Sequence, residues 1–165
     1  MQSIQTVSEN TIYVGASDRR LAKFENLFPI PRGVSYNAYV ILDEKTALLD
    51  TADASVGAQF LENVAAALDG RKLDYLIVDH MEPDHAAMIE AVLVRWPDLR
   101  LVVNAKTLPM LKMYFPTDSA AIDDALVVKE GDTLDLGKHK LTFVMAPMVH
   151  WPEVMMTFDT TTGTL

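Results

Sequence analysis

Four side chains that can bind a metal ion fall within six positions, in the run His80-Met81-Glu82-Pro83-Asp84-His85. The run follows an apolar segment, Tyr75-Leu76-Ile77-Val78, which predicts a buried strand. Pro83 favours an extended Glu82, so residues 80, 82 and 84 can point the same way, and His85 turns inward where the next helix begins. Two imidazoles and two carboxylates that meet in this loop can bind a divalent cation, and we expect two cations.

Each of these residues also has a structural explanation. Asp and His before a helix often cap it, a Glu-Pro-Asp turn is common in loops, and a buried His85 could be satisfied by one neighbour. Capping one helix requires a single acceptor, however, whereas this loop holds two carboxylates flanked by two histidines. The loop also follows a strand, at the edge where open α/β sheets bind ligands. The group as a whole therefore favours metal binding.

A second chemical signal is His150, in the segment Ala146-Pro147-Met148-Val149-His150-Trp151-Pro152. This segment follows the predicted strand 140–145, so His150 is the natural third ligand for the first cluster. Trp151 beside it can pack in the core or form the wall of a cofactor pocket. His139 lies in a predicted turn, and we expect it to be exposed rather than a ligand.

The composition narrows the kinds of site and partner. The chain has 165 residues, about one domain, and no cysteine, so any metal within it has nitrogen and oxygen ligands. Its net charge of −9 argues against binding to nucleic acids or anionic membranes. The sequence shows neither a signal peptide nor an apolar run of the roughly 18 residues that a membrane span needs, so we expect a cytoplasmic protein.

The periodicity predicts an α/β fold that places both clusters at strand ends. A helix capped by Asp53 or Ser55 should end near Gly70, and further helices are expected over 86–96 and 106–115. The acidic segment 118–124 is expected to be a solvated loop. The predicted strands cover 11–14, 35–42, 46–50, 74–79, 99–103, 126–129, 133–136, 140–145 and 153–159. We expect the three strands between 126 and 145 to be antiparallel, and Thr164-Leu165 to begin the partner of the last strand.

The motif His80-x-Glu82-x-Asp84-His85, followed later by His150-Trp151-Pro152, resembles the diiron domain of flavodiiron proteins, which belong to the metallo-β-lactamase superfold. Residues 33–39 and 48–51 are also similar to the early strands of that family. The resemblance covers nearly the whole chain and implies an αββα sandwich, with residues 1–165 as its N-terminal portion. No flavodoxin domain is expected within these residues.

The resemblance implies a role for each candidate ligand. His80, Glu82 and His150 would bind one iron, whereas Asp84 would bind the other, with His85 beside it as a ligand or a supporting group. Hydrolytic relatives generally carry His at the position of Glu82. A carboxylate there adds negative charge and a hard oxygen ligand, which favours iron over zinc.

The sequence departs from the family pattern in two respects, and the resemblance also implies a role for Asp50. The bridging Asp and the last His of the family would lie further downstream than Leu165. Ala86-Ala87 stands where Ser-Gly is frequent. Asp50 is expected to support the site structurally rather than to bind metal. The 165 residues alone are therefore expected to be inactive.

The function implied by the resemblance is the reduction of O2 to water, or of NO to N2O, with electrons from FMN. The FMN would come from a domain absent here, usually on the other subunit of a head-to-tail dimer, and Trp151 would form part of its pocket wall. The implied partners are a second copy of the chain, in a dimer or larger assembly, and an electron donor such as rubredoxin or a flavin reductase.

Two other functions remain open at this point. A metal-dependent hydrolase of the same superfold would use a metal-bound hydroxide to attack an ester, thioester or amide. A non-enzymatic interaction module would retain the fold without the reaction. Glu82 argues against the hydrolase, and the intact first cluster together with His150 argues against the interaction module.

Overall fold

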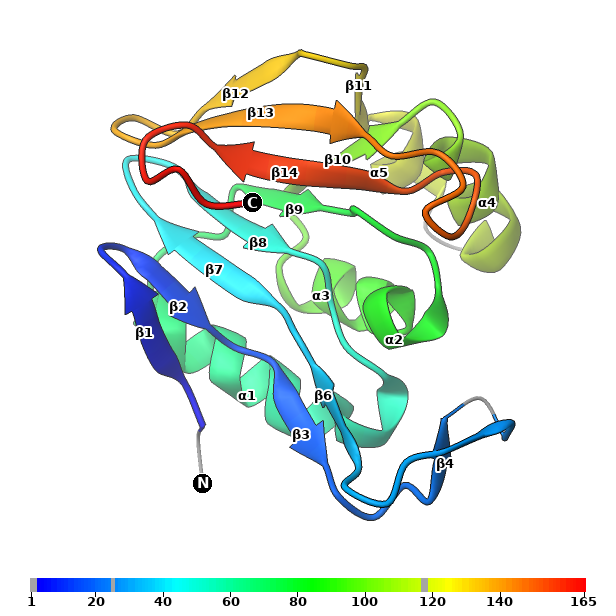
Figure 1. Ribbon diagram of the computed structural model, residues 1–165. Helices are drawn as coiled ribbons and strands as arrows, with labels where there is room; N and C mark the ends of the chain where they lie inside the picture. Colours follow the sequence, from blue (N-terminus) through cyan, green and yellow to red (C-terminus); the bar gives the residue numbers. More distant parts are fainter. Residues whose placement is uncertain (1–2, 25, 117–118) are drawn as a thin grey trace.

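The computed structural model describes residues 3–24, 26–116 and 119–165, which form two facing sheets with helices on the outer side of the larger one (Figure 1). In the larger sheet the strands lie in the order β1, β2, β7, β8, β9, β10 and β11. Their bounds are Gln5–Ser8, Thr11–Tyr13, Tyr39–Leu42, Thr46–Leu49, Tyr75–Ile77, Arg100–Asn104 and Leu126–Val128. The first four strands pair antiparallel, whereas β8, β9, β10 and β11 pair parallel.

The smaller sheet and the helices complete the layers. The smaller sheet is antiparallel and contains β12 (Thr133–Asp135), β13 (Lys140–Met145) and β14 (Met155–Asp159). Two short ribbons pair β3 (Ala16–Asp18) with β6 (Val34–Tyr36), and β4 (Lys23–Phe24) with β5 (Phe28–Pro29). The helices are η1 (Ala54–Val56), α1 (Gly57–Leu68), α2 (Pro83–Ala86), α3 (Ile89–Arg95), α4 (Thr107–Tyr114) and α5 (Ser119–Asp123). No helix in the described ranges is long and apolar enough to cross a membrane.

The alternation of side chains along the central strands produces two cores. Leu76 of β9 and Leu101 of β10 are buried toward α1 and α3, which lie below the larger sheet in Figure 1. The next residues, Ile77 and Val102, are buried against Phe143 of the smaller sheet. Successive residues of a strand face opposite sides, so the apolar runs of these strands fill both layers. The predicted α/β arrangement with two stacked sheets is confirmed.

Two expectations about residues 118–129 are wrong. Leu126–Val128 pairs parallel with β10 rather than antiparallel with its neighbours in sequence, because α4 and α5 form a crossover that returns the chain in the same direction. The acidic segment is not simply a loop, since 119–123 forms α5 with Ile122 fully buried in the core. Asp118, at the start of that segment, lies outside the described residues.

The helix expected over 86–96 is interrupted. The backbone N–H and the Oγ1 hydroxyl of Thr51 both donate to the carbonyl oxygen of His85, at 2.8 and 2.6 Å, and the N–H of Met88 donates to Oγ1 at 3.3 Å. These contacts replace hydrogen bonds that a continuous helix would make with its own backbone. The short α2, which carries Asp84 and His85, is thereby separate from α3, which packs in the core.

An open groove of about 490 Å³ lies between the two sheets. Its lining includes Ile41 of the larger sheet, Met155 of the smaller sheet and the carboxyl-bearing Asp79. Beside the groove, the outer edge of β14 is partly occupied, because Met155 N–H donates to the carbonyl of Asp79 at 3.0 Å and Asp159 N–H donates to that of Thr164 at 2.8 Å. Thr164 also forms a single antiparallel bridge with Asp159, at the position of the predicted partner strand.

Candidate metal centre

Neighbouring strands hold the backbone of the ligand loop at the end of β9. The N–H of Asp79 donates to Oδ1 of Asp50 at 2.7 Å, and the carbonyl of Asp79 accepts from Met155 N–H at 3.0 Å. Glu82 is extended, with φ −63° and ψ 144°, as the sequence predicts, whereas the helix begins at Pro83 rather than near His85. The loop is therefore fixed through its backbone, and its side chains remain available for other contacts.

The structure brings three of the five predicted ligands together: His80, Glu82 and His150. Their ligand atoms all lie within 4.8 Å of one another. Nε2 of His80 is 3.0 Å from Oε2 of Glu82, and Nε2 of His150 is 2.8 Å from the same oxygen. His80 and Glu82 are buried, whereas the side chain of His150 is 69% exposed, so the group opens to solvent at His150.

This donor set fits a divalent cation. An ionised carboxylate can only accept, so an imidazole nitrogen facing it must carry a proton or share a cation with it. Here two imidazole nitrogens face one oxygen of Glu82, and positive charge between them removes the repulsion of their lone pairs. Adjacent ligand atoms are about 3 Å apart in an octahedral shell with bonds of about 2.1 Å, similar to the separations found here.

Asp84 and His85 lie beside this group rather than within it. His85 donates from Nδ1 to Oδ2 of Asp50 at 2.8 Å, and its Nε2 is 3.6 Å from Oδ2 of Asp84. Burial lowers the pKa of His85, but the hydrogen bond and the charge of Asp50 outweigh it and raise the pKa to about 9. Burial raises the pKa of Asp84, whose Oδ1 is buried with no hydrogen-bond partner in the described part of the chain. A second cation beside Asp84 would satisfy that oxygen.

Sequence reasoning missed Glu153 as a part of this region. Glu153 is 1% exposed, and its Oε1 accepts from Nδ1 of His80 at 2.7 Å and from the N–H of Met81 at 3.0 Å. The available signal was its position directly after His150-Trp151-Pro152, since an acidic residue beside a candidate ligand often orients a histidine. The sequence predicts only a strand at Glu153, whereas β14 begins at Met155.

Asp79, which precedes His80, is a second buried carboxylate whose role the sequence pattern does not indicate. Its Oδ1 accepts from Oγ1 of Thr157 at 2.8 Å. Burial, together with the charge of the neighbouring Asp50, holds the pKa of Asp79 well above its usual value. Asp79 thus joins the end of β9 to β14 on the side of the loop that faces the groove between the sheets.

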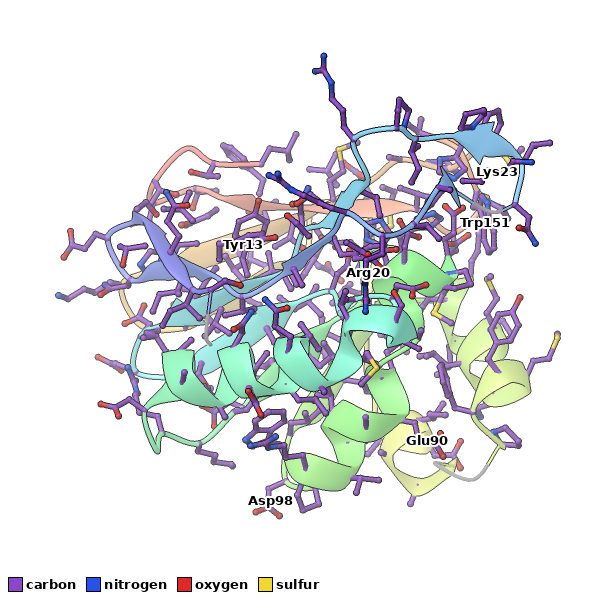
Figure 2. The ribbon with its side chains drawn as sticks, turned by 90° about the horizontal axis from the view of Figure 1, so that it is seen from below. Tyr13, Arg20, Lys23, Glu90, Asp98 and Trp151 are labelled. Carbon is purple, nitrogen blue, oxygen red and sulfur yellow. The ribbon has the colours of Figure 1, made fainter. Side chains whose placement is uncertain are left out.

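The entrance to the metal centre lies between two loops. The half-buried ring of Trp151 meets the ring of His80 edge-on, with centroids 5.3 Å apart. A cleft of about 500 Å³ reaches Glu82, with Lys23 and Tyr36 in its lining. Figures 1 and 2 show β4 with Lys23, and Trp151, at the same end of the molecule as α2. The centre is therefore accessible from outside at that end.

His139 is buried, so the expectation that it is exposed is wrong. It is 3% exposed, and its Nδ1 donates to Oδ2 of Asp159 at 2.8 Å. Its backbone N–H donates to Oδ2 of Asp43 at 2.6 Å. The turn itself is exposed at Gly137 and Lys138, but His139 is buried because two distant carboxylates accept its donors. His139 is not a member of the metal-binding group.

Residues 34–165 match the family described as ODP family beta lactamase. The chain is 36% identical over 154 residues to a nitric oxide reductase of Moorella thermoacetica, with 92% of this chain and 38% of that protein covered.

Two solved structures are similar over nearly the whole chain. Rubredoxin oxygen:oxidoreductase from Desulfovibrio gigas superposes with a TM-score of 0.88 at 31% identity, covering 95% of this chain and 38% of that one. The flavodiiron protein from Giardia intestinalis gives a TM-score of 0.88 at 26% identity, covering 96% and 38%. The chain thus spans 38% of the length of each of these three proteins. It belongs to the ODP beta-lactamase family and shares its fold with part of the flavodiiron proteins.

Proposed function

We propose that this chain carries part of the diiron centre of a flavodiiron-type reductase, which reduces O2 to water, NO to N2O, or both, with electrons from FMN. The observation that carries the proposal is the meeting of His80, Glu82 and His150 at one point, with a carboxylate at position 82. The names of the relatives, nitric oxide reductase and rubredoxin oxygen:oxidoreductase, support it. The chain spans only 38% of each of these relatives, so the proposed reaction refers to a whole protein of their kind.

In this proposal His80, Glu82 and His150 hold one iron, and Asp84 and His85 contribute to the second. Nitrogen and oxygen ligands suit iron, and the negative charge of Glu82 stabilises the ferric state. When bound, the iron pair supplies the redox chemistry that reduces O2 or NO. Residues 1–165 would be the N-terminal portion of the domain, with a bridging Asp and a last His supplied from downstream.

The chain itself provides burial, orientation and access. His80 and Glu82 are buried, so charge interactions in the centre are only weakly screened by water. Asp50 orients the ring of His85 through the 2.8 Å contact with its Nδ1. The exposed side of His150 and the cleft that reaches Glu82 leave a route for a diatomic substrate.

The partners are also part of the proposal. Trp151 would lie against an FMN ring supplied by a second copy, which requires a dimer or larger assembly. Met148 and Val149, which are 71% and 61% exposed beside His150, and the open groove between the sheets are apolar surfaces that association could cover. An electron donor such as rubredoxin or a flavin reductase would reduce the FMN. The cytoplasmic location stays a prediction from the sequence.

The hydrolase of the same superfold is less well supported. Its metal-bound hydroxide would suit a centre with an additional histidine, whereas position 82 is a glutamate that contacts both His80 and His150. The relatives described above are oxidoreductases by name. We therefore favour the reductase.

Metal loading of the full 165-residue chain without oxygen tests the proposal. We expect about one Fe²⁺ per chain, held by His80, Glu82 and His150, because the downstream ligands are not among these residues. Zn²⁺ or Ni²⁺ acquired during preparation can replace iron, since both bind such sites more tightly. Glu82→Ala should abolish binding, whereas His139→Ala, which alters a buried histidine outside the centre, should preserve it. Undiminished Fe²⁺ binding by Glu82→Ala would contradict the assignment.

A further inference from the structure

We propose that Glu153 is a positioning residue. It fixes the orientation of the His80 ring and determines which ring nitrogen carries the proton, and it thereby sets the affinity of the metal centre. The inference rests on the proposed metal site but concerns a residue outside its ligand set. It predicts that a change at Glu153 alters metal binding although Glu153 does not touch the metal.

Glu153 contacts the ring of His80 directly. Oε1 of Glu153 is 2.7 Å from Nδ1 of His80, and an ionised carboxylate can only accept a hydrogen bond. Nδ1 therefore carries a proton, and a cation that replaces any proton on Nε2 is bound through the lone pair of Nε2. Nε2 is the atom that lies 3.0 Å from Oε2 of Glu82. Glu153 thus selects the form of His80 that can bind a cation where His80, Glu82 and His150 meet.

Glu153 is itself held in place by hydrogen bonds to the surrounding backbone and to Asn104. The oxygen that accepts from His80 also accepts from the N–H of Met81 at 3.0 Å, so it fixes both the ring and the loop backbone. The backbone carbonyl of Glu153 accepts from Nδ2 of Asn104, at the end of β10, at 2.6 Å. Glu153 follows His150 by three positions, so the same residue joins the segments that carry two of the ligands.

The charge of Glu153 is buried and requires a positive partner. Its side chain is 0% exposed, and its Oε2 is buried without a hydrogen-bond partner among the described residues. A buried carboxylate is costly unless a positive group compensates it, and the ion-pair partner of Glu153 in the described ranges is His80. A cation on Nε2 supplies that positive charge through the ring, and the carboxylate makes the ring a stronger ligand. Glu153 and a bound cation therefore stabilise each other.

The test compares Glu153→Gln and Glu153→Leu in the full chain, with Asp159→Asn as the matched control. Asp159 is also a buried carboxylate that accepts from a histidine Nδ1, but outside the metal centre. Zn²⁺ affinity is measured by competition with a chelator, and the His80 tautomer is measured by nitrogen–proton NMR on the metal-free chain. Thermal unfolding shows that each variant is folded.

We expect Zn²⁺ affinity to fall about tenfold in Glu153→Gln, whose amide oxygen can still accept from Nδ1, and about 100-fold in Glu153→Leu. Nδ1 of His80 should carry a proton throughout the wild-type population and in only part of the Glu153→Leu population, and Asp159→Asn should match the wild type in both measurements. A folded Glu153→Leu chain with wild-type Zn²⁺ affinity, or with the wild-type tautomer, overturns the inference. A wild-type chain that binds no Zn²⁺ overturns the metal site instead, and the tautomer comparison then decides the role of Glu153 alone.

Discussion

Two buried histidine clusters in this chain are built alike but differ in what their carboxylates face. In the proposed metal centre, Nδ1 of His80 is 2.7 Å from Glu153, and in the second cluster Nδ1 of His139 is 2.8 Å from Asp159. The side chains of these two histidines are 8% and 3% exposed. Similar burial and a similar histidine–carboxylate bond therefore do not distinguish a metal site from a structural contact.

The difference lies in the remaining contacts. Asp159 also accepts from the N–H of Thr161 at 3.0 Å and from the hydroxyl of Thr162 at 2.7 Å, so ordinary donors compensate its charge. In the metal centre, one oxygen of Glu82 faces imidazole nitrogens of two histidines. Backbone and hydroxyl donors share the charge of Asp159, whereas Glu82 faces imidazole nitrogens that must either carry a proton or share a cation with it.

The largest expected effect separates the two clusters by metal binding. His80→Ala removes a ligand and should lower Zn²⁺ affinity more than about 100-fold, beyond the range typical for loss of a residue that only supports a ligand. His139→Ala should change that affinity less than about twofold, since His139 lies outside the centre. Isothermal titration of Zn²⁺ into both variants measures the two affinities. An equal loss of affinity in His80→Ala and His139→Ala would show that the two clusters do not differ in metal binding.

The second effect concerns stability rather than metal. His139→Ala leaves Asp159 buried without its imidazole partner and should lower the free energy of unfolding of the metal-free chain by about 2 kcal/mol, as for a hydrogen bond to a charged group. Denaturant unfolding with an unchanged slope provides the measurement. Unaltered stability would show that the threonine donors alone satisfy Asp159.

The third effect tests whether the carboxylate of Glu82 sets the metal preference of the centre. Glu82→His replaces a hard, charged oxygen by a neutral nitrogen and should shift the preference of the centre from Fe²⁺ towards Zn²⁺ by about tenfold, or about 1.4 kcal/mol. Competition between Fe²⁺ and Zn²⁺ for this chain measures the ratio of the two affinities. In a complete relative carrying the same change, turnover of O2 or NO should fall strongly. Retention of both iron content and turnover would exclude Glu82 as an iron ligand.

The smallest effect is a pH dependence of the folding stability that the second cluster contributes. Burial raises the pKa of Asp159, but hydrogen bonds from His139, Thr162 and Thr161 outweigh burial and hold the pKa below the ordinary value of 3.8. The folded state therefore binds this proton less readily than the unfolded state. The stabilisation is complete above pH 3.8 and is lost as the pH falls below it. Asp159→Asn should lack this part of the acid dependence in urea unfolding curves, and a curve parallel to that of the wild type would argue against it.

The sequence was sufficient for features encoded within a few residues. The apolar run before His80 and the proline after Glu82 are local, and they predicted the strand that precedes the loop and the extended Glu82. The features that were missed depend on contacts between distant residues. Glu153 is 73 positions from His80, Asp43 is 96 positions from His139, and Thr51 interrupts a helix 34 positions away.

The same limit applies to strand direction. Leu126–Val128 has the composition of any buried strand, and nothing within it encodes its partner. Its direction follows from the path of α4 and α5, and therefore from the burial of Ile122, which a short acidic segment did not suggest. Local pattern predicted that a strand exists there, whereas its pairing required the three-dimensional path of the chain.

The way the ligand loop is anchored has a consequence for how such a centre can evolve. The bonds to Asp79, to Met81 and to the carbonyl of His85 are all made to the backbone of the loop, by residues from other elements. None of these three anchors depends on which side chain occupies position 82. A mutation there can exchange one ligand for another while the loop keeps its shape. Inheritance can thus conserve the architecture while selection changes the metal, and new chemistry does not require a new fold.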